Sequence, residues 1–216
     1  MTARTASCAC PLCGVFGATE WYREAAHDYW RCANCALVFL SPEQRLPFGE
    51  EIERYRLHRN SGHDSGYTNF LSRLAEPMIE HVRAGAVGLD YGCGPAAALA
   101  MLMTRSGRPT DFYDPVFHPK PSLLAKRYDF VTCSEVLEHA HRPLSVLRLL
   151  ERLVRQGGKI GTMTGWYDRH TSFADWPYRR DPTHVCFFSE HTMRWLAKKF
   201  GWQLTIAATD VAIYTR

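Results

Sequence analysis

The chain has 216 residues, a formal net charge of +4 and 46% hydrophobic residues. That length fits one ordinary domain with an appendage or two small domains, and the apolar share allows a core. The mild positive charge permits an anionic partner but does not by itself indicate nucleic acid. No signal peptide is evident, and the longest apolar run falls far short of the ~20 residues of a membrane span, so we expect a cytoplasmic protein.

Two Cys-x-x-Cys pairs, separated by eighteen residues, stand near the start of the chain. They are Cys10, Cys13, Cys32 and Cys35. This spacing is typical of a tetrahedral zinc site, and four thiolates would close the coordination shell around a structural ion. The sequence therefore predicts a zinc-ribbon module over residues 1–40, too small to fold well without a metal. Cys8 is an alternative to Cys10, but Gly14, which tolerates a positive φ after the turn, favours Cys10.

Residues 41–85 are interpreted as a connector followed by a lid helix. The segment up to Gly66 is polar and charged, and its last residues, 62–66, are expected to form a flexible tip. Apolar residues then recur at helical spacing from Tyr67 onward, and Pro77 is expected to kink or restart the helix. Basic residues of this region would suit an anionic partner, although a solvated face explains them equally well. They are Arg45, Arg54, Arg56, His58 and Arg59.

Strands and helices alternate in residues 86–216. The sequence predicts strands over 86–91, 110–114, 130–134 and 159–164, a helix over 99–103, and a terminal hairpin over 202–206 and 211–215. Pro143 should open another helix that Gly157 and Gly158 end, and Ser189 should cap one that runs to about Phe200. This alternation predicts an α/β fold with a largely parallel sheet.

A glycine turn lies where the first of these strands meets the first helix. Gly92 and Gly94 let the backbone turn sharply and approach a ligand closely. Asp90 precedes the turn, and Asp114 ends the next strand, where its carboxylate can accept hydrogen bonds from ribose hydroxyls. The pattern predicts a cofactor with a nucleoside part.

Three segments, in this order, resemble motifs of class I S-adenosylmethionine-dependent methyltransferases. They are Asp90-Tyr-Gly-Cys-Gly-Pro, Tyr128–His139, and the run from Leu153 through Gly157-Gly158. The resemblance covers roughly residues 67–216 and implies a Rossmann-like sheet whose last strand is antiparallel. It also implies that Asp90, Gly92 and Gly94 flank the methionine part of S-adenosylmethionine and that Asp114 holds its ribose. The chain is similar to a subgroup of small methyltransferases that carry an N-terminal zinc ribbon.

Two departures from the family pattern matter. Ala96 stands where the family usually has a third glycine, which narrows the turn. Only 13 residues separate Asp114 from Tyr128, too few for the usual helix and strand, so we expect a sheet one strand short and leave the adenine contacts unassigned. A dehydrogenase would also use a glycine turn, but the chain lacks its second half-domain. A non-enzymatic binding protein with a degenerate fold is the other alternative.

The segment from Ser134 to His139 offers the first candidate chemistry. It resembles the segment of ubiquinone-pathway O-methyltransferases that is associated with a divalent ion, which implies an ion at Glu135, Glu138 and His139. The alternative is that the segment shapes the cofactor pocket, with Ser134 and Glu135 among the cofactor-binding residues.

A loop from Asp175 to His184 offers the second candidate chemistry. It follows a strand end, where ligands of α/β sheets bind, and can cover the substrate. His184, and less strongly His139, could accept a proton near neutral pH. Tyr178 and the two arginines that follow it could orient an anionic or aromatic acceptor. The alternative is a loop fixed by turn chemistry, with a histidine that only packs.

The sequence thus predicts a methyltransferase domain over residues 86–216 that transfers a methyl group from S-adenosylmethionine to a small molecule, on oxygen. One alternative acceptor is RNA or protein, docked through the zinc module. The sequence gives no reason to expect a membrane partner, and it leaves the acceptor and the oligomeric state open.

Overall fold

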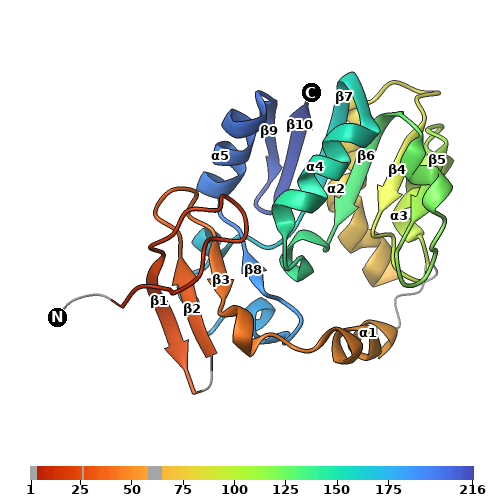
Figure 1. The fold of residues 1–216 in the computed structure, drawn as a ribbon. Coiled ribbons are helices and arrows are strands. Elements are labelled where there is room, and N and C mark those ends of the chain that lie inside the picture. The colour runs from red at the N-terminus through yellow and green to blue at the C-terminus, as the bar shows by residue number, and fades with distance from the viewer. Residues whose placement is uncertain (1–3, 26, 58–64) are drawn as a thin grey trace.

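The structure is a computed structural model, and it describes residues 4–25, 27–57 and 65–216. It contains a six-stranded sheet flanked by helices and a smaller four-stranded sheet near the N-terminus (Figure 1). Among the described residues, no helix is long and apolar enough to cross a membrane. Residues 62–64 of the tip predicted over 62–66, and the basic residues His58 and Arg59, lie outside the described residues. Residues 65 and 66 of that tip instead begin a helix, Ser65–His81.

The large sheet has the order β5-β4-β6-β7-β10-β9. Its strands are β4 (Gly88–Tyr91), β5 (Thr110–Tyr113), β6 (Tyr128–Ser134), β7 (Val154–Met163), β9 (Gln203–Ala208) and β10 (Val211–Thr215). The first four strands in sequence pair in parallel, and β10 is antiparallel to both of its neighbours. The predicted fold class, with an antiparallel last strand and one strand fewer than usual, is confirmed. Between β5 and β6 the chain forms only a 3₁₀ turn, Pro121–Ala125.

Helices cover both faces of this sheet (Figure 1). They are α2 (Ser65–His81), α3 (Ala98–Arg105), α4 (Pro143–Leu153) and α5 (Glu190–Phe200). Helix α1 (Phe48–Leu57) lies below the sheet in Figure 1, apart from both faces. Side chains of α2 and α3 pack with Val211 and Ile213, whereas those of α4 and α5 pack with Ala212 and Tyr214. Alternate residues of β10 therefore serve opposite faces, as the period of a strand requires. The predicted cap is confirmed, because the Ser189 hydroxyl accepts a hydrogen bond from the Thr192 amide at 3.1 Å.

Three expectations about helices need correction. Gly157 and Gly158 do not end α4, which stops at Leu153; they lie within β7. A Cβ at Gly158 would lie 2.7 Å from the Asp129 carbonyl oxygen. The glycine therefore allows β7 to approach β6 closely at this point. Pro77 does not restart a helix, because it lies inside α2, which continues to His81. The segment predicted to be a connector contains α1, and the polar composition of this helix hid its helical pattern in the sequence.

The small sheet joins the N-terminal strands to one short strand from the last third of the chain. It contains β1 (Thr19–Glu24), β2 (His27–Arg31), β3 (Val38–Leu40) and β8 (Cys186–Phe187), all antiparallel. Figure 1 shows β8, which precedes α5 in the chain, beside β3 of the N-terminal module. One hydrophobic core extends from the cysteines of the module to the face of the large sheet under α4 and α5. The boundary at residue 40 therefore marks a change of sheet but not a separate core.

Candidate functional site

The four paired cysteines form one cluster. Their ligand atoms all lie within 4.8 Å of one another, with Sγ–Sγ distances of 3.6 Å for Cys10–Cys35 and 3.4 Å for Cys13–Cys32. Tetrahedral zinc with Zn–S bonds of about 2.3 Å would place neighbouring sulfurs about 3.8 Å apart. The donor set and its spacing fit such an ion, and Cys8 is not part of the cluster.

The backbone of both cysteine turns supports this arrangement. In each turn the residue after the second cysteine donates an amide hydrogen bond to the carbonyl of the first cysteine, at 2.9 Å. These residues are Gly14 and Ala36, with φ values of 76° and 56°. The positive φ expected of Gly14 is confirmed, and Ala36 accepts the same conformation despite its Cβ.

A cavity of about 700 Å³ opens at the carboxyl ends of β4, β5 and β6. It is lined by all but one of the predicted cofactor-binding and catalytic residues: Gly92, Gly94, Asp114, Ser134, Glu135, His139, Tyr178 and His184. Sequence segments separated by more than ninety positions therefore meet at one concave site, which is where α/β sheets bind ligands.

The glycine turn forms one wall of this cavity. Gly92 and Gly94 have φ values of 75° and 63°. A Cβ at Gly92 would collide with the side chain of Val136, whereas at Gly94 it would meet nothing within 4 Å. Gly92 is thus required by packing as well as by conformation. Ala96 is not among the residues with positive φ; that conformation falls on Ala97, with φ 45°.

Asp114 anchors the turn from the neighbouring strand. One carboxylate oxygen, Oδ2, accepts a hydrogen bond from the Gly94 amide at 3.1 Å, and Oδ1 accepts from the amides of Val116 and Phe117 at 2.8 and 3.0 Å. The side chain lines the cavity and is 8% exposed. A carboxylate has further lone pairs, which suit a ligand with hydroxyl donors, such as a ribose.

Asp90 does not line the cavity, in contrast to the other predicted residues. Its side chain is buried, and Oδ1 accepts a hydrogen bond from the Thr132 hydroxyl at 2.8 Å. Burial raises the pKa of Asp90 to about 7, partly offset by hydrogen bonds from Thr132 and from the backbone of Ala100 in α3. Asp90 therefore joins β4, β6 and the start of α3 behind the turn.

Ser134 and Glu135 end β6 at the centre of the cavity. The Ser134 hydroxyl is buried without a hydrogen-bond partner, which is unfavourable unless a ligand or water supplies one. Glu135 has a left-handed backbone, φ 51°, which is strained for a residue with a Cβ. Burial and the neighbouring Glu138 raise the pKa of Glu135, which favours its protonated form.

Glu138 lies fully buried beside the cavity. The Thr164 hydroxyl donates to its Oε2 at 2.9 Å, and the Tyr178 hydroxyl donates to its Oε1 at 2.5 Å. Burial, Glu138 and Glu135 raise the pKa of Tyr178 well above its usual range. Tyr178 is therefore a hydrogen-bond donor in this site and not a base.

The rings of the two predicted histidines pack edge to face. The ring centroids of His139 and His184 are 4.6 Å apart, and Tyr178 lies 4.2 Å from His184. Each Nδ1 contacts a backbone carbonyl, that of Thr183 for His139 at 3.2 Å and that of Tyr178 for His184 at 2.7 Å. Because a carbonyl only accepts, each Nδ1 carries the proton in the neutral ring, and Nε2 keeps a free lone pair. Burial lowers the pKa of His184, which favours that neutral form.

These contacts change the predicted divalent-ion set. The ligand atoms of Glu138, His139 and His184 lie within 4.8 Å of one another, and Glu135 is not a member of that group. Two imidazole nitrogens and a carboxylate suit a divalent transition-metal ion, and the carbonyls behind the rings would fix their orientation. His184, from the loop, takes the place that the sequence assigned to Glu135.

The arginines of the loop do not serve an acceptor. Arg179 is buried and turned away from the cavity, with its guanidinium 2.6 Å from the Glu24 carboxylate. Arg180 is exposed and does not line the cavity. The expectation that this pair orients an anionic acceptor was wrong, because neighbouring side chains in a 3₁₀ turn point in different directions. Arg45 likewise donates to the carbonyls of Leu40 and His141.

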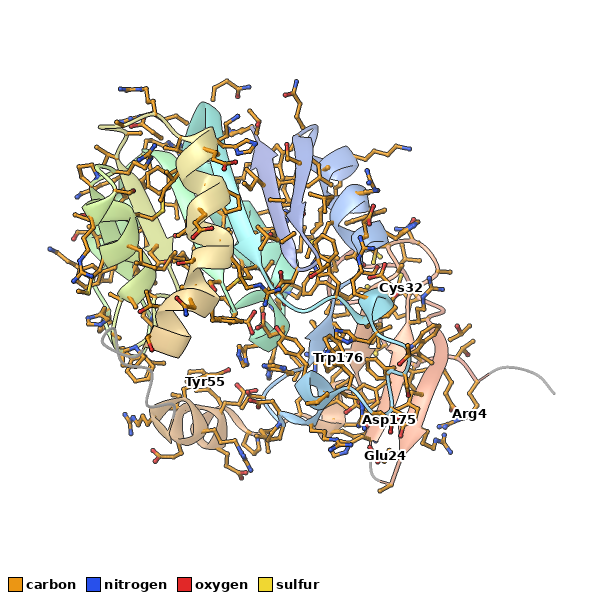
Figure 2. All side chains as sticks on the ribbon, turned by 180° about the vertical axis from the view of Figure 1, so that it is seen from behind. Arg4, Glu24, Cys32, Tyr55, Asp175 and Trp176 are labelled. Carbon is orange, nitrogen blue, oxygen red and sulfur yellow. The ribbon has the colours of Figure 1, made fainter. Side chains whose placement is uncertain are left out.

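Sequence reasoning missed an aromatic wall contributed by α1 and α2. Tyr55, Tyr67 and Phe70 line the cavity, and the Tyr55 ring packs edge-on against His139 with centroids 5.2 Å apart. Figure 2 labels Tyr55 on the side of α1 that faces the rest of the molecule. The helical spacing of Phe48, Ile52 and Tyr55 was the available signal for this wall.

Comparison with curated proteins gives partial matches to O-methyltransferases. The chain is 37% identical over 87 residues to "Ubiquinone biosynthesis O-methyltransferase" of Citrobacter koseri and 33% identical over 87 residues to that of Pseudomonas paraeruginosa. Each match covers 40% of this chain but only 36% and 37% of those relatives. The chain thus matches little more than a third of the length of these relatives.

Solved structures show the same fold at low sequence identity. Magnesium protoporphyrin IX methyltransferase from Synechocystis, with bound S-adenosylhomocysteine, has a TM-score of 0.53 at 12% identity, covering 78% of this chain and 94% of that one. A putative methyltransferase in complex with the Trm112 activator, from Haloferax volcanii, has a TM-score of 0.50 at 15% identity, covering 72% and 78%. The family model described as "Methyltransferase domain" matches residues 56–206, more than half of the chain. The chain therefore belongs to the methyltransferase-domain family, that of S-adenosylmethionine-dependent methyltransferases.

Proposed function

We propose that the protein transfers a methyl group from S-adenosylmethionine to a hydroxyl oxygen of a small molecule. One observation carries the proposal: the glycine turn and the imidazoles of His139 and His184 open into the same cavity. Methyl transfer needs the two reactants in line, and a hydroxyl acceptor also needs a group that takes its proton. The match to proteins named O-methyltransferases supports oxygen as the acceptor atom.

The cavity divides into two sides in this proposal. Gly92, Gly94 and Asp114 would hold the cofactor, and Ser134 would donate its unused hydroxyl to it. The sulfonium of the cofactor would lower the pKa of Glu135 and favour its carboxylate, since an opposite charge stabilises the ionised form. Asp90 would act from behind the turn by holding α3 in place.

The aromatic wall and the loop form the acceptor side. Tyr55 and Phe70 would flank a flat or apolar acceptor. Tyr178 would turn its single hydroxyl donor from Glu138 to this acceptor when it binds. The free Nε2 of His139 or His184 would take the hydroxyl proton, since both rings are held with Nδ1 protonated. A transferable methyl group is already activated, so positioning supplies much of the acceleration.

Two metal sites belong to the proposal. The four cysteines would hold a structural zinc ion, which closes their coordination shell. Glu138, His139 and His184 would hold a divalent ion that polarises the acceptor oxygen, in place of the histidine base. Methyl transfer is measured after an EDTA treatment that leaves the cysteine-bound zinc in place, as elemental analysis checks, and again after adding back Mg²⁺ or Mn²⁺. Activity that is lost and then restored supports the ion mechanism, and activity that is unaffected supports the histidine base.

The test is transfer of label from S-adenosyl-[methyl-³H]methionine to a panel of catechols, other phenols, aliphatic alcohols, total tRNA and denatured protein. Calorimetry with S-adenosylhomocysteine comes first, with NAD as control. Label in hydroxylated small molecules supports the proposal. Label confined to tRNA or protein would instead identify a macromolecular acceptor. Folded, zinc-loaded protein that binds no S-adenosylhomocysteine would be a non-enzymatic relative.

A further inference from the structure

Arg179 links the loop on the acceptor side to the N-terminal module. It follows Tyr178 in the 3₁₀ turn Pro177–Arg180 but points to the opposite side. Its side chain is 5% exposed, and Nη1 lies 2.6 Å from the carboxylate of Glu24, the last residue of β1. Removing Glu24 would leave a buried cation without its partner, which is unfavourable.

The guanidinium of Arg179 is held from several directions. Its Nε donates to the Phe173 carbonyl at 3.1 Å, and Nη2 donates to the Ala174 carbonyl at 2.6 Å. Its Cζ lies 5.0 Å from the ring centroid of Tyr22 in β1 and 5.7 Å from that of Tyr29 in β2. The planar fork therefore ties the start of the loop to the face of the β1–β2 hairpin. Figure 2 shows Glu24 and the loop residues Asp175 and Trp176 on the same side of the molecule.

A second connection holds the other end of the loop. Phe39 of β3 pairs with Cys186 of β8, and the Leu40 amide donates to the Val185 carbonyl at 3.0 Å. The Val185 amide in turn donates to the Glu138 carbonyl at 2.8 Å. Val185, next to His184, is thus bonded on one side to the module and on the other to the segment that carries Glu138.

Strands β2 and β3, which contribute to these connections, each have one end next to the cysteine cluster, whereas Glu24 lies at the opposite end of the β1–β2 hairpin, paired with His27. Cys32 directly follows β2, which carries Tyr29, and Cys35 lies three residues before β3. The Ala36 carbonyl, in the second cysteine turn, accepts a hydrogen bond from the Tyr167 hydroxyl at 2.7 Å. Four cysteine ligands on one ion would fix the end of β2 and the start of β3 relative to each other.

From these contacts we infer that the N-terminal module positions Tyr178 and His184, with the Glu24–Arg179 ion pair as the positioning contact. Glu24 touches neither the cavity lining nor the glycine turn, so it acts through Arg179 and the loop. The inference rests on the proposed function only in assigning this loop to the acceptor. The N-terminal module is therefore needed for the acceptor side, while the cofactor side keeps its affinity.

The test uses the zinc-loaded protein labelled with 5-fluorotryptophan and compares Glu24→Gln with Glu20→Gln. Glu20 lies on the same strand but pairs with Arg4 and Arg23, not with the loop. Trp176, stacked on Tyr178 with centroids 4.8 Å apart and 6% exposed, reports the loop by ¹⁹F NMR. The resonance of Trp202, packed on Phe200 and Tyr214, is the internal reference.

We expect Glu24→Gln to move or broaden the Trp176 resonance and leave that of Trp202 in place, while Glu20→Gln changes neither. The S-adenosylhomocysteine Kd should stay within about twofold, since distant sites act independently. An unchanged Trp176 resonance, or equal shifts of Trp176 and Trp202, would overturn the inference. If neither the wild-type protein nor the variants bind S-adenosylhomocysteine, the proposed function is wrong. The ¹⁹F comparison still decides whether Glu24 positions the loop.

Discussion

The hydroxyl of Tyr178 lies 2.5 Å from Oε1 of Glu138, a carboxylate that is fully buried beside the cavity. Thr164 donates to the other oxygen of the same carboxylate at 2.9 Å. Tyr178 also lines the cavity, whereas Thr164 does not. Variants of these two residues therefore distinguish two roles for Tyr178. Both side chains support Glu138, but only Tyr178 can also act directly on an acceptor.

We predict that Tyr178→Phe lowers methyl transfer about 100-fold and that Thr164→Val lowers it far less, because only Tyr178 lines the cavity and can turn its single hydroxyl donor from Glu138 toward a bound acceptor. Each variant leaves one buried oxygen of Glu138 with one donor fewer, at a cost of about 1–3 kcal/mol in the free energy of unfolding. Unfolding by urea and kcat/KM, measured on both variants, check this. Equal losses of kcat/KM in the two variants would mean that Tyr178 only supports Glu138.

The cysteine cluster gives a prediction about metal content. Cys32→Ser should reduce bound zinc from about one equivalent to near none and lower the thermal midpoint, because the metal supplies much of the folding energy of so small a module. Cys8→Ser is the matched control, since Cys8 lies close in sequence but outside the cluster. Elemental analysis and thermal unfolding check both. Zinc retained in Cys32→Ser and lost in Cys8→Ser would contradict the assignment.

The sequence predicts much of this architecture because its signals are local. Cysteine spacing and the Asp90–Gly94 turn each involve residues close in the chain, and strand and helix periods show the layers. The orientation of Arg179 was not predictable, since its partner Glu24 is 155 positions away. The pairing of β8 with β3 is also non-local, and a strand of two residues has no period to detect.

Asp90 gives a prediction about pH. Its pKa is raised by burial from an ordinary value near 3.9 to about 7 in the folded protein. The folded state therefore binds the proton more tightly, so the stability from this group is complete below about pH 4 and is lost as the pH rises through about 7. Relative to Asp90→Asn, the wild-type protein should lose on the order of a few kcal/mol between these limits.

Urea unfolding of both proteins from pH 4 to 8 measures the Asp90 effect. Asp129→Asn is the control, because hydrogen bonds from the Val87 backbone and from Arg155 lower the pKa of Asp129, which stays ionised over this range. Its stability difference from wild type should be constant across these pH values. Parallel curves for wild type and Asp90→Asn would show that Asp90 is ionised in the folded protein.

The glycine turn gives a prediction with a built-in rescue. Both Gly92→Ala and Gly94→Ala place a Cβ on a residue with positive φ, at a cost of about 1–2 kcal/mol each. Gly92→Ala also drives that Cβ into Val136, whereas the space at Gly94 is open. We therefore expect Gly92→Ala to be the less stable variant, and Gly92→Ala/Val136→Ala to recover the difference, as a double-mutant cycle of unfolding free energies would show. Additive effects of Gly92→Ala and Val136→Ala would mean that the turn adjusts without contact between these side chains, and that the glycine serves conformation alone.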